Sequence, residues 1–229
     1  MLSKLVGVLF VILLVAGVPA LSFATARSSQ VRQIPRLSLY LSASLSQWLL
    51  AGLGGLVVLL TFRDGLLLGF RTVPPGVLMQ WGGALVVASL AGLGASLFLG
   101  QRGWWPEESE LVYLLIPETP LEKLWSVVLL APTAALCEEF LYRGYLLSQL
   151  GQWCHSASWG VALSSLAFGL AHIYQGWSGM VRAALLGALL AYPVVRLGSL
   201  YPSMVAHGLI DALALAWLGP KLLPQKPVS

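Results

Sequence analysis

Long apolar runs, separated by short polar stretches, are the main pattern in this chain. They cover residues 5–24, 38–62, 77–100, 121–150, 157–174, 180–197 and 200–218. About 20 consecutive apolar residues in a helix are enough to cross the hydrocarbon core of a bilayer. The pattern therefore predicts an all-α fold, a multi-pass transmembrane helical bundle of about seven spans.

The first run has a second interpretation, because residues 24–26 (Ala-Thr-Ala) resemble the cleavage site of a signal peptide. Two features oppose that interpretation. The run is long enough to span a bilayer, and it is followed directly by Arg27, Arg32 and Arg36. Positive charge just after a signal sequence hinders its translocation. We therefore expect an uncleaved first helix.

The most polar segment is 101–120, which also holds Trp104, Trp105 and Tyr113. Tryptophan and tyrosine collect at the membrane–water interface, so this segment predicts a loop with a short interfacial helix. The expected division of the chain is N-terminal helices and loop over 1–120, a core over 121–218 and a flexible tail over 219–229.

Composition supports a membrane-embedded chain and excludes several other classes. Hydrophobic residues make up 58% of the sequence and charged residues 10%, and the mean hydropathy is +0.82. Soluble domains carry about 25% charged residues. We expect an integral membrane protein, in the cell membrane, with the lipid bilayer as its main partner. A net charge of +4 without a Lys/Arg-rich run does not indicate nucleic-acid binding, and two cysteines do not indicate a disulfide framework.

The basic residues sort into two sides if the bundle has seven spans. One side holds Arg27, Arg32, Arg36, Arg102, Lys123, Arg182, Lys221 and Lys226. The other side holds Lys4, Arg63, Arg71 and Arg196. The positive-inside rule then places the first side, with the C-terminus, in the cytoplasm.

Charged residues interrupt the fourth run at Glu138, Glu139 and Arg143. Each such side chain at a bilayer centre costs about 2.5–3.5 kcal/mol even on mild insertion scales. Glu139 and Arg143 are four residues apart, so they share a helix face and can form an ion pair. Glu138 lies on another face, where Tyr142 can donate a hydrogen bond to it. This geometry predicts a charge-balanced Glu139 and an available Glu138.

Two histidines lie in the apolar runs that follow. His172 ends one run, with Phe168 one turn earlier, and His207 shares a helix face with Asp211. His155 lies in a loop, and we interpret Cys137 as a small core residue. The ionisable groups deep in predicted spans are thus Glu138, Glu139, Arg143, His172, His207 and Asp211.

Two hydrolytic chemistries fit this set. In the first, Glu138 is a general base for a water that attacks an amide or ester carbonyl, and the histidines position the water and stabilise the oxyanion. In the second, a zinc ion activates the water, with Glu138, His172 and His207 as its ligands. The familiar His-Glu-x-x-His zinc motif is absent. Either chemistry needs a water-filled recess. Gly169, Gly176 and Gly208 have no side chains and are expected to leave room for one.

A non-enzymatic membrane protein is the third possibility. Buried Glu, His and Arg also serve proton-coupled transport, and a scaffold or immunity protein has the same composition. The sequence shows no internal repeat, which counts against a carrier built from duplicated halves.

Three short motifs resemble those of a known family. Glu138-Glu139-Phe140-Leu141-Tyr142-Arg143 matches Glu-Glu-x-x-x-Arg. The second and third motifs, Phe-x-x-x-His and His-x-x-x-Asn/Asp, match residues 168–172 and 207–211. In this order, on apolar helices, they resemble the CAAX protease and bacteriocin-processing (CPBP/Abi) family of intramembrane proteases, related to the Ras-converting CAAX endopeptidases. The resemblance covers roughly 121–218.

The resemblance implies an intramembrane endopeptidase with a polar intramembrane cavity, acting on a membrane-associated protein or peptide. It implies that Glu138 is catalytic, that Glu139 and Arg143 support it, and that His172 helps to activate water. It also implies that His207 and Asp211 stabilise the oxyanion. An ionised Asp211 cannot donate a hydrogen bond as asparagine does, so it must be protonated, orient His207 or bind a metal. Both a prenylated C-terminal peptide and a bacteriocin leader remain candidate substrates.

Overall fold

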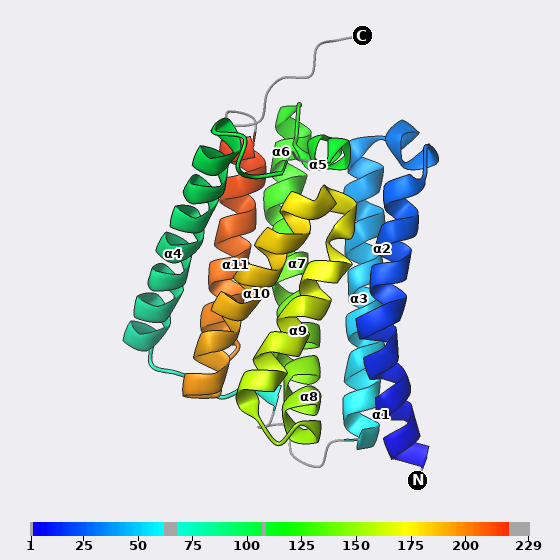
Figure 1. The fold of residues 1–229 in the computed structure, drawn as a ribbon, viewed down its shortest axis with the longest axis vertical. Helices are drawn as coiled ribbons and strands as arrows, with labels where there is room; N and C mark the ends of the chain where they lie inside the picture. Colours follow the sequence, from blue (N-terminus) through cyan, green and yellow to red (C-terminus); the bar gives the residue numbers. More distant parts are fainter. Residues whose placement is uncertain (1, 62–67, 107–108, 220–229) are drawn as a thin grey trace.

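The computed structural model describes residues 2–61, 68–106 and 109–219 as a bundle of helices that run roughly side by side (Figure 1). These residues form helices and turns, with an isolated β-bridge between Phe70 and Ser199. The flexible tail expected after Gly219, and the sides expected for Arg63, Lys221 and Lys226, concern residues outside the described ranges.

The first half of the chain gives three long helical segments. The first is continuous over α1 (Leu2–Ile12), the π-helix η1 (Leu13–Gly17) and α2 (Val18–Arg27). The 3₁₀ turn η2 (Gln30–Gln33) leads to the second and third, α3 (Arg36–Thr61) and α4 (Pro75–Gln101).

The second half begins with the short helix α5 (Glu110–Leu115). One continuous helix over Pro120–Trp153 follows, made of α6 (Pro120–Trp125), η4 (Ser126–Leu130), α7 (Ala131–Glu138), η5 (Glu139–Leu146) and α8 (Leu147–Trp153). The remaining elements are α9 (Ala157–Ala171), η6 (Ile173–Gln175), α10 (Gly176–Leu197), α11 (Tyr201–Leu213) and η7 (Ala214–Leu218).

The predicted all-α membrane bundle is confirmed. Five helical segments of the described residues are long and apolar enough to cross a membrane, namely Leu2–Arg27, Arg36–Thr61, Pro75–Gln101, Pro120–Trp153 and Ile173–Leu197. The fifth predicted span corresponds to α9, which is shorter, and the seventh to α11 with η7. The protein is therefore an integral membrane protein, while seven as the number of spans stays a prediction.

Apolar side chains point outward along the long helices. Leu59, Met79 and Val87 are 81%, 77% and 69% exposed. Large exposed apolar surface is rare on soluble monomers and is what a lipid-facing surface requires. The bundle thus presents its hydrophobic residues both to its core and to the bilayer.

The segment 101–120 contains the short helix α5, while its place at the membrane interface stays a prediction. Helix α5 begins at Ser109, whose side chain accepts a hydrogen bond from the Leu111 N–H. The long helix begins with a capping box, in which Thr119 and Glu122 each bond the other's backbone N–H. In Figure 1, α5 and the start of α6 lie at the same end of the bundle as the α2–α3 connection and the C-terminal end of α4. This arrangement agrees with the expected grouping of Arg27, Arg32, Arg36, Arg102 and Lys123.

Two of the π-helices immediately precede a proline-containing turn. Pro19 follows η1 and Pro132 follows η4. A proline inside a helix removes one N–H and crowds the carbonyl four residues earlier, and a locally wider turn relieves that crowding. The prolines therefore leave both long helices continuous.

The first helix packs into the core of the second half. Leu14 is fully buried, Phe10 lies edge-on to Tyr145 with ring centroids 5.1 Å apart, and the Tyr145 hydroxyl donates to the Gly7 carbonyl at 3.1 Å. Removal of residues 1–26 would strip these contacts from η5. An uncleaved first helix stays a prediction.

Several glycines lie where neighbouring helices approach closely. Of Gly52, Gly54 and Gly55 in α3, only Gly54 is crowded, because an added Cβ would lie 3.0 Å from Leu141. Gly169 does not line a recess as expected: a Cβ there would lie 2.7 Å from the Met180 carbonyl oxygen on α10. Gly208 similarly faces Ala135 on α7 at 3.4 Å. Of these contacts, the one at Gly208 joins two motif-bearing helices, α11 and α7.

We predict that Gly169→Ala lowers the free energy of unfolding by about 1–3 kcal/mol, because the added methyl group forces α9 away from α10. Thermal unfolding in detergent measures the effect. Gly52→Ala is the matched control, since no atom lies within 4 Å of its added Cβ, and it should leave the midpoint unchanged or slightly higher. Equal midpoints for both variants would contradict the packing described here.

Candidate active site

Glu138 is the last residue of α7, and its carboxylate faces three other helices. Its Oε1 accepts a 2.8 Å hydrogen bond from Gln47 Nε2 on α3. Its Oε2 lies 3.9 Å from His172 Nε2 and 3.8 Å from His207 Nε2. The side chain is 14% exposed. One carboxylate oxygen is thus held by an amide, while the other faces two imidazoles.

The next residue, Glu139, forms the ion pair predicted with Arg143. Arg143 Nη1 lies 3.1 Å from Glu139 Oε1, and the two side chains are 1% and 0% exposed. Both residues belong to the π-helix η5, and π-helical turns occur frequently at functional sites. Breaking a buried pair leaves an uncompensated charge, so each residue requires the other.

Arg143 has two further partners that the sequence did not indicate. Its Nε donates to the Gly187 carbonyl on α10 at 3.4 Å, and its guanidinium lies over the Phe168 ring, 4.0 Å from the centroid. A Cβ at Gly187 would lie 3.0 Å from Arg143 Nη2, so only glycine leaves the guanidinium this space. The cation is therefore enclosed by a carboxylate, a carbonyl and an aromatic face.

His172 is the C-cap residue of α9, and its ring is oriented by its own helix. Its Nδ1 lies 2.8 Å from the Phe168 carbonyl oxygen, which can only accept, so Nδ1 carries the proton. In the neutral ring, Nε2 is then the acceptor that faces Glu138. The Phe168 ring supports the imidazole from 4.5 Å between centroids.

His207, on α11, lies between carboxylates. Its Nδ1 bonds Glu139 Oε1 at 2.8 Å, and its Nε2 lies 3.4 Å from Asp211 Oδ2. Acidic oxygens thus face both ring nitrogens, an arrangement that suits a ring in which both nitrogens donate. His207 is 4% exposed and Asp211 is 29% exposed. Asp211 is therefore the member of the cluster most accessible from outside.

The structure brings all six predicted residues into one cluster, from three helical segments. The Tyr142 interaction is not formed: its hydroxyl is buried and has no hydrogen-bond partner among the described residues. Its ring instead packs edge-on against Phe168, with centroids 5.1 Å apart. Gln47 takes the place expected for Tyr142. Cys137 is 1% exposed, in agreement with a core position.

The atoms that would hold zinc in the second chemistry are Glu138 Oε2, His172 Nε2 and His207 Nε2. Within the described residues, no group of three or more His, Cys, Asp and Glu is arranged to hold a metal ion. Tetrahedral zinc with nitrogen and oxygen ligands keeps its donors about 3.4 Å apart. The separations of Glu138 Oε2 from the two imidazole nitrogens are longer, 3.9 and 3.8 Å.

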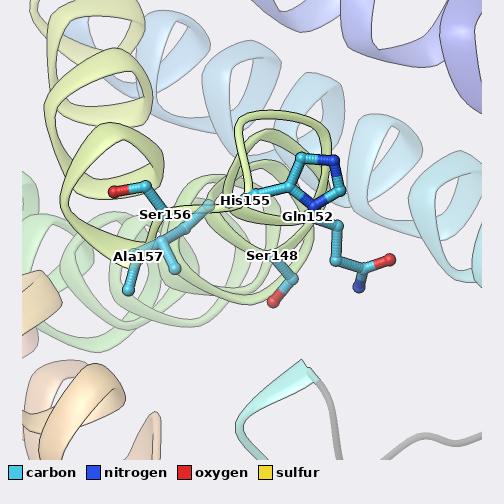
Figure 2. A pocket seen from close by; sticks show the side chains of 7 residues that line it. Ser148, Gln152, His155, Ser156 and Ala157 are labelled. Carbon is cyan, nitrogen blue, oxygen red and sulfur yellow. The ribbon is translucent and has the colours of Figure 1, made fainter.

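A separate pocket of about 380 Å³ lies at the turn between α8 and α9 (Figure 2). Its lining includes Ser148, Gln152, His155 and Ser156, and none of the six clustered residues. It borders the first residues of α9, whereas His172 follows the last. The polar intramembrane cavity expected around Glu138 is a different feature and stays a prediction.

The part of the chain that carries these motifs matches a known protein family. Residues 120–213 match the family profile described as Type II CAAX prenyl endopeptidase Rce1-like. These residues are similar to the CAAX protease family. No curated protein and no solved structure matches the chain. The match supports membership of the CAAX branch and says nothing specific about bacteriocin processing. It includes every one of the six residues but not Gln47.

We predict that Arg143→Met lowers the free energy of unfolding by about 3–5 kcal/mol, because Glu139 is left as an unpaired buried charge. The double variant with Glu139→Gln should lose less than the sum of the two single variants. A double-mutant cycle of thermal unfolding in detergent measures this coupling. Arg32→Met is the control at the exposed Arg32–Glu110 pair and should cost about 0–1 kcal/mol. Additive losses at 139 and 143 would refute the coupling.

Proposed function

We propose that this protein is an intramembrane endopeptidase in which Glu138 activates a water molecule for attack on a peptide bond. The observation that carries the proposal is the position of Glu138 Oε2, 3.9 Å from His172 Nε2 and 3.8 Å from His207 Nε2. A base, an acceptor and a donor converge there in largely buried surroundings. General bases of this kind contribute typically 10²–10⁴-fold to a rate.

In the proposed first step, a water molecule donates one hydrogen bond to Glu138 Oε2 and the other to His172 Nε2. Glu138 takes the first proton as the water oxygen bonds to the carbonyl carbon of the scissile peptide. The electron pair of the C=O bond moves to its oxygen, which becomes an oxyanion. His172 keeps the water oriented because its Nδ1 proton is committed to the Phe168 carbonyl.

In the second step, the tetrahedral intermediate collapses. His207 Nε2–H donates a hydrogen bond to the oxyanion, and its ring is held by Glu139 at Nδ1. The carbonyl reforms, the C–N bond breaks, and Glu138 returns its proton to the leaving amine. In this scheme Asp211 orients His207 and need not contact the oxyanion, which explains how aspartate can stand where the family also uses asparagine.

The substrate proposed first is a prenylated C-terminal peptide, because the matching family is described as a CAAX prenyl endopeptidase. A bacteriocin leader is the second substrate class. The charged groups of the site lie on helices of the membrane bundle, so either substrate must bring its peptide bond to the membrane.

We predict that Glu138→Gln lowers the cleavage rate of a farnesylated, fluorophore-quencher CAAX peptide by at least about 100-fold, because glutamine cannot accept the proton from water. To detect cleavage of other substrates, new protein termini are mapped in membranes that contain the wild-type protein and in membranes that contain Glu138→Gln. Glu118→Gln is the control, since its side chain is 67% exposed at the interfacial loop. Wild-type rates and the same new termini with Glu138→Gln would overturn the proposal.

Metal content provides an independent test. We expect purified wild-type protein to contain far less than one zinc per chain by elemental analysis, and cleavage to survive a strong chelator. About one zinc per chain, lost in the His172→Ala, His207→Ala double variant and retained in His155→Ala, would instead establish the zinc-dependent alternative. Proton-driven uptake of a solute into vesicles, without cleavage of any peptide, would favour the transporter.

A further inference from the structure

A residue outside the family segment contacts the proposed base. Gln47 lies on α3, 91 positions before Glu138, and its Nε2 donates the 2.8 Å hydrogen bond to Glu138 Oε1. We propose that Gln47 is a positioning residue that fixes the orientation of the Glu138 carboxylate. The inference rests on the proposed role of Glu138 and adds a second helix to it.

The two oxygens of Glu138 have different surroundings. Oε1 faces Gln47, whereas Oε2 faces His172 and His207. Rotation about the last side-chain bond of a glutamate is only weakly restricted, so a carboxylate without a fixed partner samples many orientations. The amide hydrogen bond at Oε1 determines which lone pairs Oε2 presents to the water position. The nearby cation, Arg143, is paired with Glu139 at 3.1 Å. The group that orients Glu138 is therefore the uncharged amide of Gln47.

The amide itself is well oriented. Gln47 Oε1 is buried and has no hydrogen-bond partner among the described residues, so no competing bond turns the amide away. The reversed amide would place its oxygen against a carboxylate oxygen, where neither atom can donate. The bond to Glu138 therefore sets the direction of the side chain.

The helix that carries Gln47 is fixed against α7. The adjacent Trp48 donates through Nε1 to Thr133 Oγ1 on α7 at 3.1 Å. Gly54 lets α3 approach η5 so closely that an added Cβ would lie 3.0 Å from Leu141. A misplacement of about 1 Å at a catalytic group can lower a rate by about 100-fold. The close packing of α3 keeps the Gln47 amide in a fixed position relative to Glu138.

The decisive comparison is between two hydrogen bonds of the same helix pair. Gln47→Met keeps the length of the side chain and removes the donor to Glu138. Thr133→Val keeps the shape of its side chain and removes the acceptor of Trp48, without touching Glu138. Both variants are measured for kcat and KM on the farnesylated peptide and for the midpoint of thermal unfolding.

We expect Gln47→Met to lower kcat by about 10- to 100-fold with KM changed less than about twofold, while Thr133→Val keeps the wild-type kcat. If the two variants lower kcat equally, Gln47 only joins two helices and the inference is wrong. Wild-type kcat for Gln47→Met, with Glu138→Gln inactive, overturns this inference alone. Wild-type activity for Glu138→Gln overturns the proposed function as well.

A second variant keeps the test independent of stability. Gln47→Glu introduces a carboxyl group opposite Glu138 Oε1, and two carboxylates in contact retain one proton between them as the pH falls. That proton restores a hydrogen bond to Oε1. We expect activity to be lost at high pH, where both carboxyl groups are ionised, and to be partly recovered as the pH falls and the pair takes up one proton, whereas Gln47→Met shows no such recovery. Identical pH profiles for the two variants would contradict the positioning role.

Discussion

The buried ion pair between Glu139 and Arg143 is the constraint on which the rest of the site depends. Two charges at 0% and 1% exposure are tolerable only together. Glu139 also accepts from His207, and Arg143 reaches the Gly187 carbonyl and the Phe168 ring. The pair thus connects η5 to α9, α10 and α11. The Phe168 ring in turn packs against His172, so the pair contacts His207 directly and His172 through Phe168.

The pair also separates two neighbouring acids by function. Glu139 is neutralised by Arg143, and this leaves its carboxylate as a fixed support for His207. Glu138, one residue earlier, receives only an uncharged amide at Oε1 and keeps Oε2 directed at two imidazoles. Consecutive glutamates can thus take different roles because the turn of the helix directs them to different neighbours.

Properties that depend on local sequence were predictable, and those that depend on distant contacts were not. The apolar runs predicted the helices, and the four-residue spacing of Glu139 and Arg143 predicted their ion pair. Gln47 escaped notice because an amide in an apolar helix is not ionisable and its partner is far along the chain. Tyr142 was assigned to Glu138 by spacing alone, but Phe168 from another helix captures its ring. Gly169 was assigned to a recess, although it packs tightly against α10.

The order of the motifs along the chain has a consequence for biosynthesis. Gln47 and the Glu139–Arg143 pair lie in segments that are made early, and the pair can neutralise itself inside one helix during insertion. His207 and Asp211 lie on α11, the last described α-helix of the chain. Until α11 has entered the bilayer, the nascent protein lacks His207, which is proposed to stabilise the oxyanion, and Asp211, which is proposed to orient His207. An intramembrane protease arranged in this way stays inactive while it is still being synthesised.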